Sequence, residues 1–166
     1  MRIHPRALLL ACAAAAVTST AMAGTVNVSF VDAQRFTDVG TTRWDEDANL
    51  KVLAKHLAGL GQRYLPADQV MTIEVLDVDL AGTVWPSRGA TADVRIVKGG
   101  ADWPRITLRY SLEQPGKPVR RGEETVSDMN YTHGRTSTIG TEPLYHEKRM
   151  LDEWFKARFG EHDAAD

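Results

Sequence analysis

The sequence has almost no cysteine: Cys12 is the only one in 166 residues, and it lies in the apolar N-terminal stretch. A single thiol cannot form a disulfide within the chain, and it cannot build an all-cysteine zinc site or a paired redox site. The chain is therefore not a small disulfide scaffold. It is long enough to bury most of its apolar surface without such cross-links.

Basic runs, internal repeats and Gly/Ser-rich linkers are also absent. Lys and Arg number 20 against 22 Asp and Glu, for a net charge of −2. Because no basic stripe with interleaved aromatic side chains is present, the sequence predicts no nucleic-acid partner. The length and composition predict one ordinary globular domain over residues 24–160, followed by a short disordered tail at 161–166.

Several patterns of catalysis and phosphate binding are missing or incomplete. No GxSxG stretch marks a nucleophile elbow, and Gly99–Ala101 lacks the GK[ST] ending of a phosphate loop. His146 and Glu147 begin like the zinc-protease pattern HExxH, but Met150 stands where the second His is needed. We therefore favour a protein that is not an enzyme, and we predict no cofactor.

The N-terminus has the three parts of an export signal. Arg2 and Arg6 are followed by the uncharged apolar run Ala7–Val17 and then by Ala21-Met22-Ala23, a small-x-small cleavage pattern. The apolar run is shorter than the roughly 20 residues that cross a bilayer, so we predict no transmembrane segment. We predict that residues 1–23 are a signal peptide cleaved after Ala23 and that the protein is periplasmic.

Lipid attachment is an alternative reading of the same segment. Leu9-Leu10-Ala11-Cys12 loosely resembles a lipobox, in which Cys12 would carry the lipid. The apolar run continues past this residue to Val17, which argues against that reading. The alternative of lipidation at Cys12 stays open.

Hydrophobic periodicity predicts five strands and two helices after residue 24. Alternation of apolar and polar residues predicts strands at 25–30, 69–80, 92–96, 106–112 and 119–129. An apolar stripe predicts a first helix with Thr42 as its N-cap and Pro66 past its end. The stripe consists of Leu50, Leu53, Leu57, Leu60 and Tyr64. A second helix is predicted over 142–159, capped by Thr141 and ended by Gly160.

This order, β-α-β-β-β-β-α, predicts an α+β fold. The first two strands should be parallel through a right-handed crossover, and the others, joined by short turns, should be antiparallel. We therefore expect a two-layer sandwich, in which a mostly antiparallel five-stranded sheet has two helices on one face. The apolar phase changes at Val75-Leu76, so this strand either is covered on both sides at different places or carries a bulge there. The highly charged strand at 119–129 suits a sheet edge.

The polar stretch SDMNYTHGRTSTIG, residues 127–140, is the first candidate site. Ser127, Asp128 and His133 are the residue types of a hydrolase triad, but adjacent strand residues point to opposite faces of a sheet. We therefore predict binding rather than catalysis for this loop, through Asp128, Asn130, Tyr131 and His133, because long polar loops often carry function.

Two Trp-Pro pairs are the second candidate. Trp85 and Trp103 either close the ends of the core or form a patch with neighbouring arginines such as Arg105, and we favour the core role. As speculative binding residues, Trp103 and Arg105 join the polar loop.

A metal site is the third candidate. Asp77 and Asp79 share one face of a strand and offer two oxygen ligands to a hard cation. Such a pair is common without a metal, so these residues are weak candidates and we predict no metal.

Several stretches together resemble a known family. They are Phe30-Val31-Asp32 with Phe36 and Asp38, TIEVLDVDLAG (72–82), WPRITLRY (103–110), SDMNY (127–131) and EKRMLDEWF (147–155). Together they resemble the bacterial exported family known as domain of unknown function 3016. The resemblance implies a single-domain envelope protein of Gram-negative type. It implies no activity and no catalytic residues, because the family has none assigned.

These observations predict an exported, non-catalytic domain that binds an envelope protein, another envelope component or a small ligand. The alternative is a small periplasmic hydrolase or metal-dependent enzyme that uses Asp128, His133 and either Asp77 or Asp79. The sequence names neither the partner nor the oligomeric state.

Overall fold

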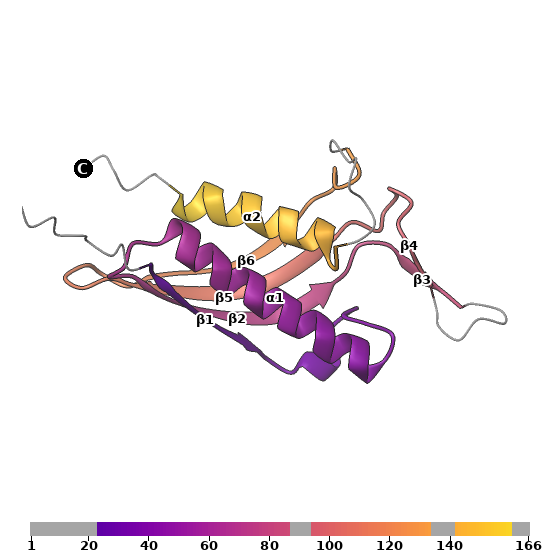
Figure 1. Ribbon diagram of the computed structural model, residues 1–166, viewed down its shortest axis with the longest axis horizontal. Helices are drawn as coiled ribbons and strands as arrows, with labels where there is room; N and C mark the ends of the chain where they lie inside the picture. The colour runs from indigo at the N-terminus through magenta and orange to yellow at the C-terminus, as the bar shows by residue number, and fades with distance from the viewer. Residues whose placement is uncertain (1–22, 87–93, 134–141, 161–166) are drawn as a thin grey trace, which may run out of the picture.

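A computed structural model describes residues 23–86, 94–133 and 142–160 (Figure 1). The elements follow in chain order as β1 (Thr25–Phe30), η1 (Ala33–Arg35), α1 (Arg43–Tyr64), β2 (Val70–Asp79), β3 (Thr83–Trp85), β4 (Val94–Ile96), β5 (Arg105–Glu113), β6 (Arg120–Ser127) and α2 (Tyr145–Phe159). The predicted α+β class is confirmed.

The main sheet has four strands in the order β1-β2-β5-β6. Strands β1 and β2 are parallel, as predicted, and β2, β5 and β6 are antiparallel to their neighbours. The prediction of a five-stranded sheet was wrong. The strand expected at 92–96 is the short β4, which pairs only with β3 in a separate two-stranded ribbon. Alternation had indicated a strand there, but it does not say which strand becomes the partner.

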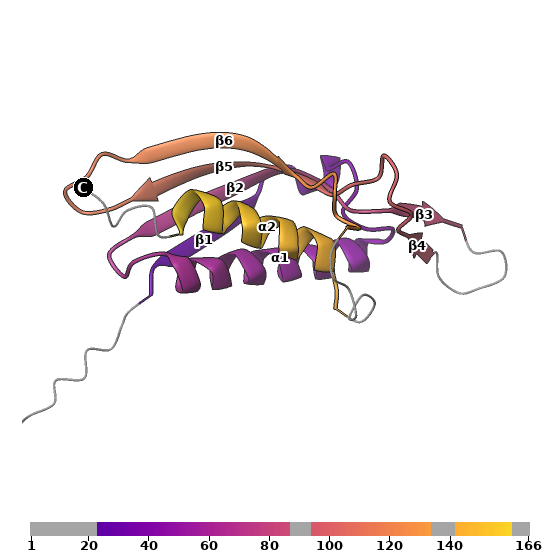
Figure 2. The same cartoon turned by 90° about the horizontal axis from the view of Figure 1, so that it is seen from above.

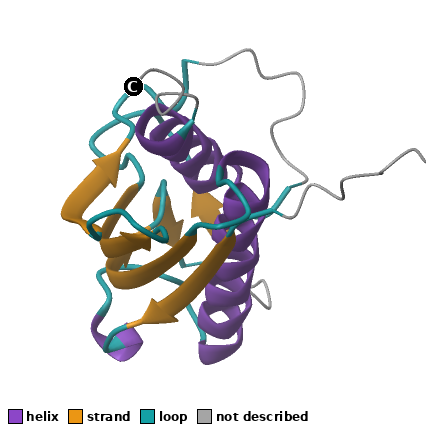
Figure 3. Ribbon diagram, turned by 90° about the vertical axis from the view of Figure 1, so that its left-hand side faces the viewer, coloured by secondary structure: helices purple, strands orange, loops and turns teal. Residues whose placement is uncertain are grey.

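The two helices lie on one face of the main sheet, as expected (Figures 2 and 3). Between the layers lies a core of aliphatic and aromatic side chains from β2, β5, α1 and α2. Its fully buried members include Leu53, Leu57, Met71, Ile73, Leu108, Leu151 and Phe155. No described element covers the other face of the sheet, which we call the open face.

The predicted change of phase in β2 is confirmed. The register between β2 and β5 shifts between Val75 and Asp77. Because one extra residue is accommodated there, Val75 and Val78 both enter the core. Asp77 and Asp79 consequently lie on the open face. The charged strand β6 is an edge strand, also as predicted.

The first helix begins as expected, and the second begins later. The Oγ1 atom of Thr42 accepts a hydrogen bond from the backbone N–H of Asp45 at 3.2 Å, so Thr42 is the N-cap of α1. Helix α2 starts at Tyr145 instead of 142, because Leu144 adopts a left-handed conformation with φ of 55°. The predicted cap, Thr141, lies outside the described residues, and Gly160 ends the helix as predicted.

Candidate functional site

Four of the family-like stretches meet at one end of the sheet, on the right in Figure 1. Their contacts involve Asp102, Asp128, Tyr131, Glu147 and Arg149, which we call the junction. The Tyr131 side chain is only 1% exposed. Its hydroxyl donates to Asp102 Oδ1 at 2.6 Å and accepts from the N–H of Gly99 at 3.1 Å. Burial and the bond to the Asp102 carboxylate raise the pKa of Tyr131 to about 12.

The turn after β6 is fastened to α2 within this junction. Arg149 Nη2 donates to Asp128 Oδ2 at 2.6 Å and to the Tyr131 carbonyl at 3.0 Å. The hydrogen bond to Asp128 raises the pKa of Arg149 above its ordinary value. The other oxygen of Asp128 accepts from the N–H of Asn130 at 2.9 Å and shapes the turn. Asp128 therefore holds the turn and the helix together.

The incomplete zinc-protease pattern also has a structural role. Glu147 is buried, and its Oε1 atom accepts a hydrogen bond from the N–H of Ala81 at 2.7 Å. The His146 ring packs edge-on against Tyr131 with 5.0 Å between ring centroids. Among the described residues, the buried Nδ1 of His146 has no hydrogen-bond partner. The start of α2 thus fastens the end of β2 to the core.

The remaining predicted binding residues lie nearer the surface. Asn130 and His133 are exposed, and the N–H of His133 donates to the Asn130 carbonyl at 2.8 Å. Trp103 is half-buried, and the guanidinium of Arg105 lies 5.5 Å from its ring centroid. A binding role for these residues stays a prediction. The rest of the polar loop, residues 134–140, lies outside the described residues.

The structure does not bring the residues of the enzyme alternative together. Asp77 accepts hydrogen bonds from the N–H and the hydroxyl of Thr37, at 2.7 and 2.8 Å. Asp79 pairs with Arg105 on the open face, whereas Asp128 pairs with α2 on the helix side. Within the described part of the chain, no group of three or more His, Cys, Asp or Glu is placed to hold a metal ion.

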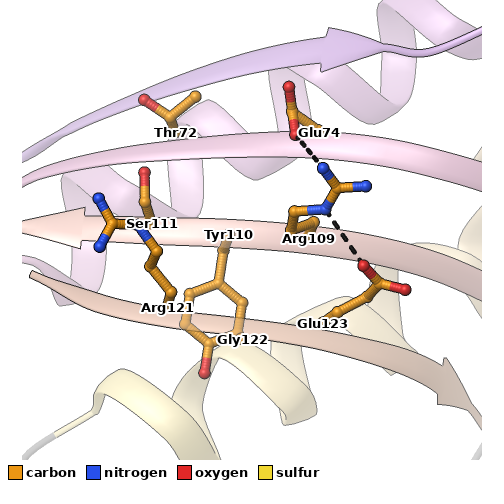
Figure 4. A pocket seen from close by; sticks show the side chains of 8 residues that line it. All are labelled: Thr72, Glu74, Arg109, Tyr110, Ser111, Arg121, Gly122 and Glu123. Carbon is orange, nitrogen blue, oxygen red and sulfur yellow. Dashed lines mark hydrogen bonds and ion pairs between the residues drawn. The ribbon is translucent and has the colours of Figure 1, made fainter.

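A shallow depression of about 420 Å³ lies on the open face (Figure 4). At its centre, Arg109 lies between Glu74 at 3.3 Å and Glu123 at 3.1 Å. Arg121 extends from β6 across β5 toward Ser111 (Figure 4). The charges at the centre compensate one another across three neighbouring strands. Two arginines and two glutamates line the depression, so it has little net charge to select a ligand.

The β3–β4 ribbon carries a pair of exposed apolar side chains, and it projects away from the body (Figure 1). Trp85 and Val94 lie directly opposite each other in the two strands. They are 51% and 54% exposed, so the expectation that Trp85 closes the core was wrong. The ammonium of Lys98 lies 4.3 Å from the Trp85 ring centroid. The sequence signal for this surface was the Trp85-Pro86 pair. Nothing in the sequence pointed to Val94.

The face of the ribbon opposite Trp85 and Val94 holds it against the body of the domain. Arg95 alternates with Val94 along β4, so its side chain lies on the other side of the ribbon. Two of its nitrogens donate to the two carboxylate oxygens of Asp38, each at 2.8 Å. A bidentate pair of this kind fixes orientation as well as position. Because Arg95 faces the body, Trp85 and Val94 face away from it.

These features define a small two-layer α+β domain with a fastened junction and a projecting ribbon. The family model described as "Protein of unknown function (DUF3016)" matches residues 24–157, so the chain belongs to this family. The resemblance noted in the sequence is thereby confirmed. No curated protein and no solved structure matches the chain. Within the described residues, no helix has both the length and the apolar character needed to cross a membrane.

Proposed function

We propose that this chain is an exported periplasmic domain that binds a partner protein without catalysing a reaction. Its contact surface is the outward face of the β3–β4 ribbon. The observation that carries the proposal is the exposed pair of Trp85 and Val94 at the end of an anchored arm. The export signal expected at residues 1–23 supports the location.

The ribbon has little stabilisation of its own, which supports the proposal that a partner covers it. An isolated two-stranded ribbon is marginally stable in water, and strands of three residues contribute few hydrogen bonds. Here the Trp85–Val94 pair adds little burial, since about half of each side chain is exposed. A partner that covers the pair gains the apolar area that the domain leaves uncovered. Trp is also among the residues that contribute most to binding at protein interfaces.

The chemistry around Trp85 indicates what kind of surface fits. Lys98 lies over the indole ring and brings a positive charge beside the apolar pair. Val97, which is also exposed, precedes Lys98 in the chain. We therefore expect a partner surface with an apolar pocket for the Trp85 ring and a carboxylate on the rim of that pocket.

A pull-down with paired tryptophan variants tests the proposal. Trp85→Ala should lose the partner captured from an envelope extract by the wild-type protein. Trp44→Ala is the matched control, because Trp44 is 87% exposed and belongs to α1, outside the ribbon. It should capture the same partner as the wild type. Identical captures by the wild type and Trp85→Ala would contradict the assignment. Mass spectrometry of the purified protein tests export, which predicts a chain that begins at Gly24.

A further inference from the structure

Strand β1 is an edge strand without the usual protection. Its sequence, TVNVSF, has no charge, no proline and no bulge, and no described strand lies beyond it. Exposed edges present unpaired N–H and C=O groups and invite another strand, so proteins often guard them with charges. The opposite edge, β6, is guarded in this way by Arg120, Arg121, Glu123 and Glu124 (Figure 2).

The hydrogen bonds to β2 show which groups of β1 point outward. The N–H of Thr25 donates to the Gln69 carbonyl at 3.1 Å, and the N–H of Val31 donates to the Val75 carbonyl at 2.9 Å. In a parallel pair, alternate residues direct both backbone groups toward the neighbouring strand. The odd-numbered residues of β1 therefore face β2. The N–H and C=O groups of Val26, Val28 and Phe30 face away from it.

We propose that a second copy of this chain pairs with β1, strand against strand, to form a symmetric dimer with a continuous sheet. The outward residues are spaced evenly about Val28. A two-fold axis there places Val28 opposite Val28 of the partner subunit, and Val26 opposite Phe30 of the partner subunit. In each of these pairs the two residues exchange both backbone hydrogen bonds, as in an antiparallel ladder. The register follows from the backbone directions alone.

The side chains of this pairing match in kind on both faces of the sheet. On the helix side, valine and phenylalanine meet, and the half-buried Val28 and Phe30 become covered. On the open face, Asn27 meets Ser29 of the partner subunit. No charged side chain of β1 meets another, because the strand has none. A contact of this kind is self-complementary, as a two-fold interface requires.

A groove beside β1 fits one of the partner's side chains. It has a volume of about 270 Å³ and lies between the start of β1 and α1, lined by Gly24, Val26, Ala58 and Gln62 among others. The proposed register puts the partner subunit's Phe30 opposite Val26 and on the helix side, at the mouth of this groove. The small Ala58 side chain leaves room for the ring. The dimer is independent of the ribbon and goes beyond the proposed partner binding.

A charge-swap experiment tests the dimer. One variant carries Asn27→Lys with Ser29→Lys, and the other carries Asn27→Glu with Ser29→Glu. Both positions are on the solvent side, so the fold should be retained, which circular dichroism checks. In a dimer, each variant places like charges directly opposite each other, and we expect its dissociation constant to rise about tenfold or more. Mixing the two variants places opposite charges together and should restore a heterodimer.

Masses are measured by analytical ultracentrifugation on protein expressed from its full sequence and purified as the cell processes it. The wild type should be mostly dimeric at about 100 μM, each variant should contain a clearly smaller fraction of dimer, and the mixture should be mostly dimeric again. A matched control, Thr125→Lys with Ser127→Lys, puts the same charges on β6 and should leave the dimer intact. A wild type that is monomeric at this concentration overturns the proposal. So does a dimer fraction that is unchanged in both β1 variants or that falls in the β6 control.

Discussion

At the scale of single residues, Tyr131 shows how a polar side chain can belong to the core. Its ring is buried, and its hydroxyl still has a donor and an acceptor partner at the surface side of the junction. We expect Tyr131→Phe to lower the free energy of unfolding by about 1–2 kcal/mol, because it removes both hydrogen bonds of the hydroxyl and leaves the Gly99 N–H without its acceptor. Urea denaturation measures the change. Tyr64→Phe, whose hydroxyl has no described partner, should change it far less.

The same residue predicts a pH dependence. The hydrogen bond from Tyr131 lowers the pKa of Asp102 below its ordinary value of 3.8. A lowered carboxylate pKa stabilises the fold above that value, and this contribution is lost as the pH falls through the folded-state pKa. The raised pKa of Tyr131 stabilises the fold below pH 10, and that contribution is lost between 10 and about 12. When the pH moves from neutral to either extreme, the free energy of unfolding of Tyr131→Phe should therefore fall less than that of the wild type. Parallel pH profiles would contradict this reading.

At the scale of elements, the ion pair of Asp128 and Arg149 joins the turn after β6 to α2. Its side chains are 16% and 22% exposed, and its bond is short. A double-mutant cycle with Asp128→Asn and Arg149→Gln should give a coupling free energy of about 1.5–3 kcal/mol, as for hydrogen bonds between charged groups. The exposed pair of Arg109 and Glu123 on the open face is the control and should give less than about 1 kcal/mol. Equal coupling free energies in the two cycles would mean that the Asp128–Arg149 pair stabilises the fold no more than an exposed surface pair does.

The ribbon makes a second prediction at this scale. Arg95→Ala removes the bidentate contact with Asp38 but touches no core side chain. We expect faster hydrogen exchange of the β3 and β4 amides, with unchanged exchange in β2 and β5, because the ribbon then opens locally. Unchanged exchange in β3 and β4 would show that another contact holds the arm.

Much of each element could be predicted from short-range patterns. The strands of the main sheet and both helices were visible in the sequence pattern. The bulge after Val75 was visible in the change of apolar phase, and the Thr42 cap in the residue type before the first helix. Strand β3 was not, because three residues are too few to show alternation. The orientation of the ribbon was also hidden, because Arg95 pairs with Asp38, which is 57 residues away in the sequence.

At the scale of the whole molecule, the site was harder to predict than the fold. Asp128 and Tyr131 looked like residues of a surface loop, since nothing near them in the sequence reveals burial. Their partners, Arg149 and Asp102, are 21 and 29 residues away. Tertiary contacts therefore place these two residues in the junction, and their binding role stays a prediction. An exposed apolar pair lies instead on the ribbon, where the pairing of β3 with β4 presents Trp85 and Val94 outward.

The central claim is that the outward face of the ribbon contacts a partner protein. The most direct measurement is crosslinking in living cells, with a photoreactive amino acid in place of Trp85 or, as the control, of Trp44. The account predicts that light produces one discrete adduct of higher mass from position 85 and none from position 44. The absence of an adduct at position 85, or the same adduct at both positions, would contradict it.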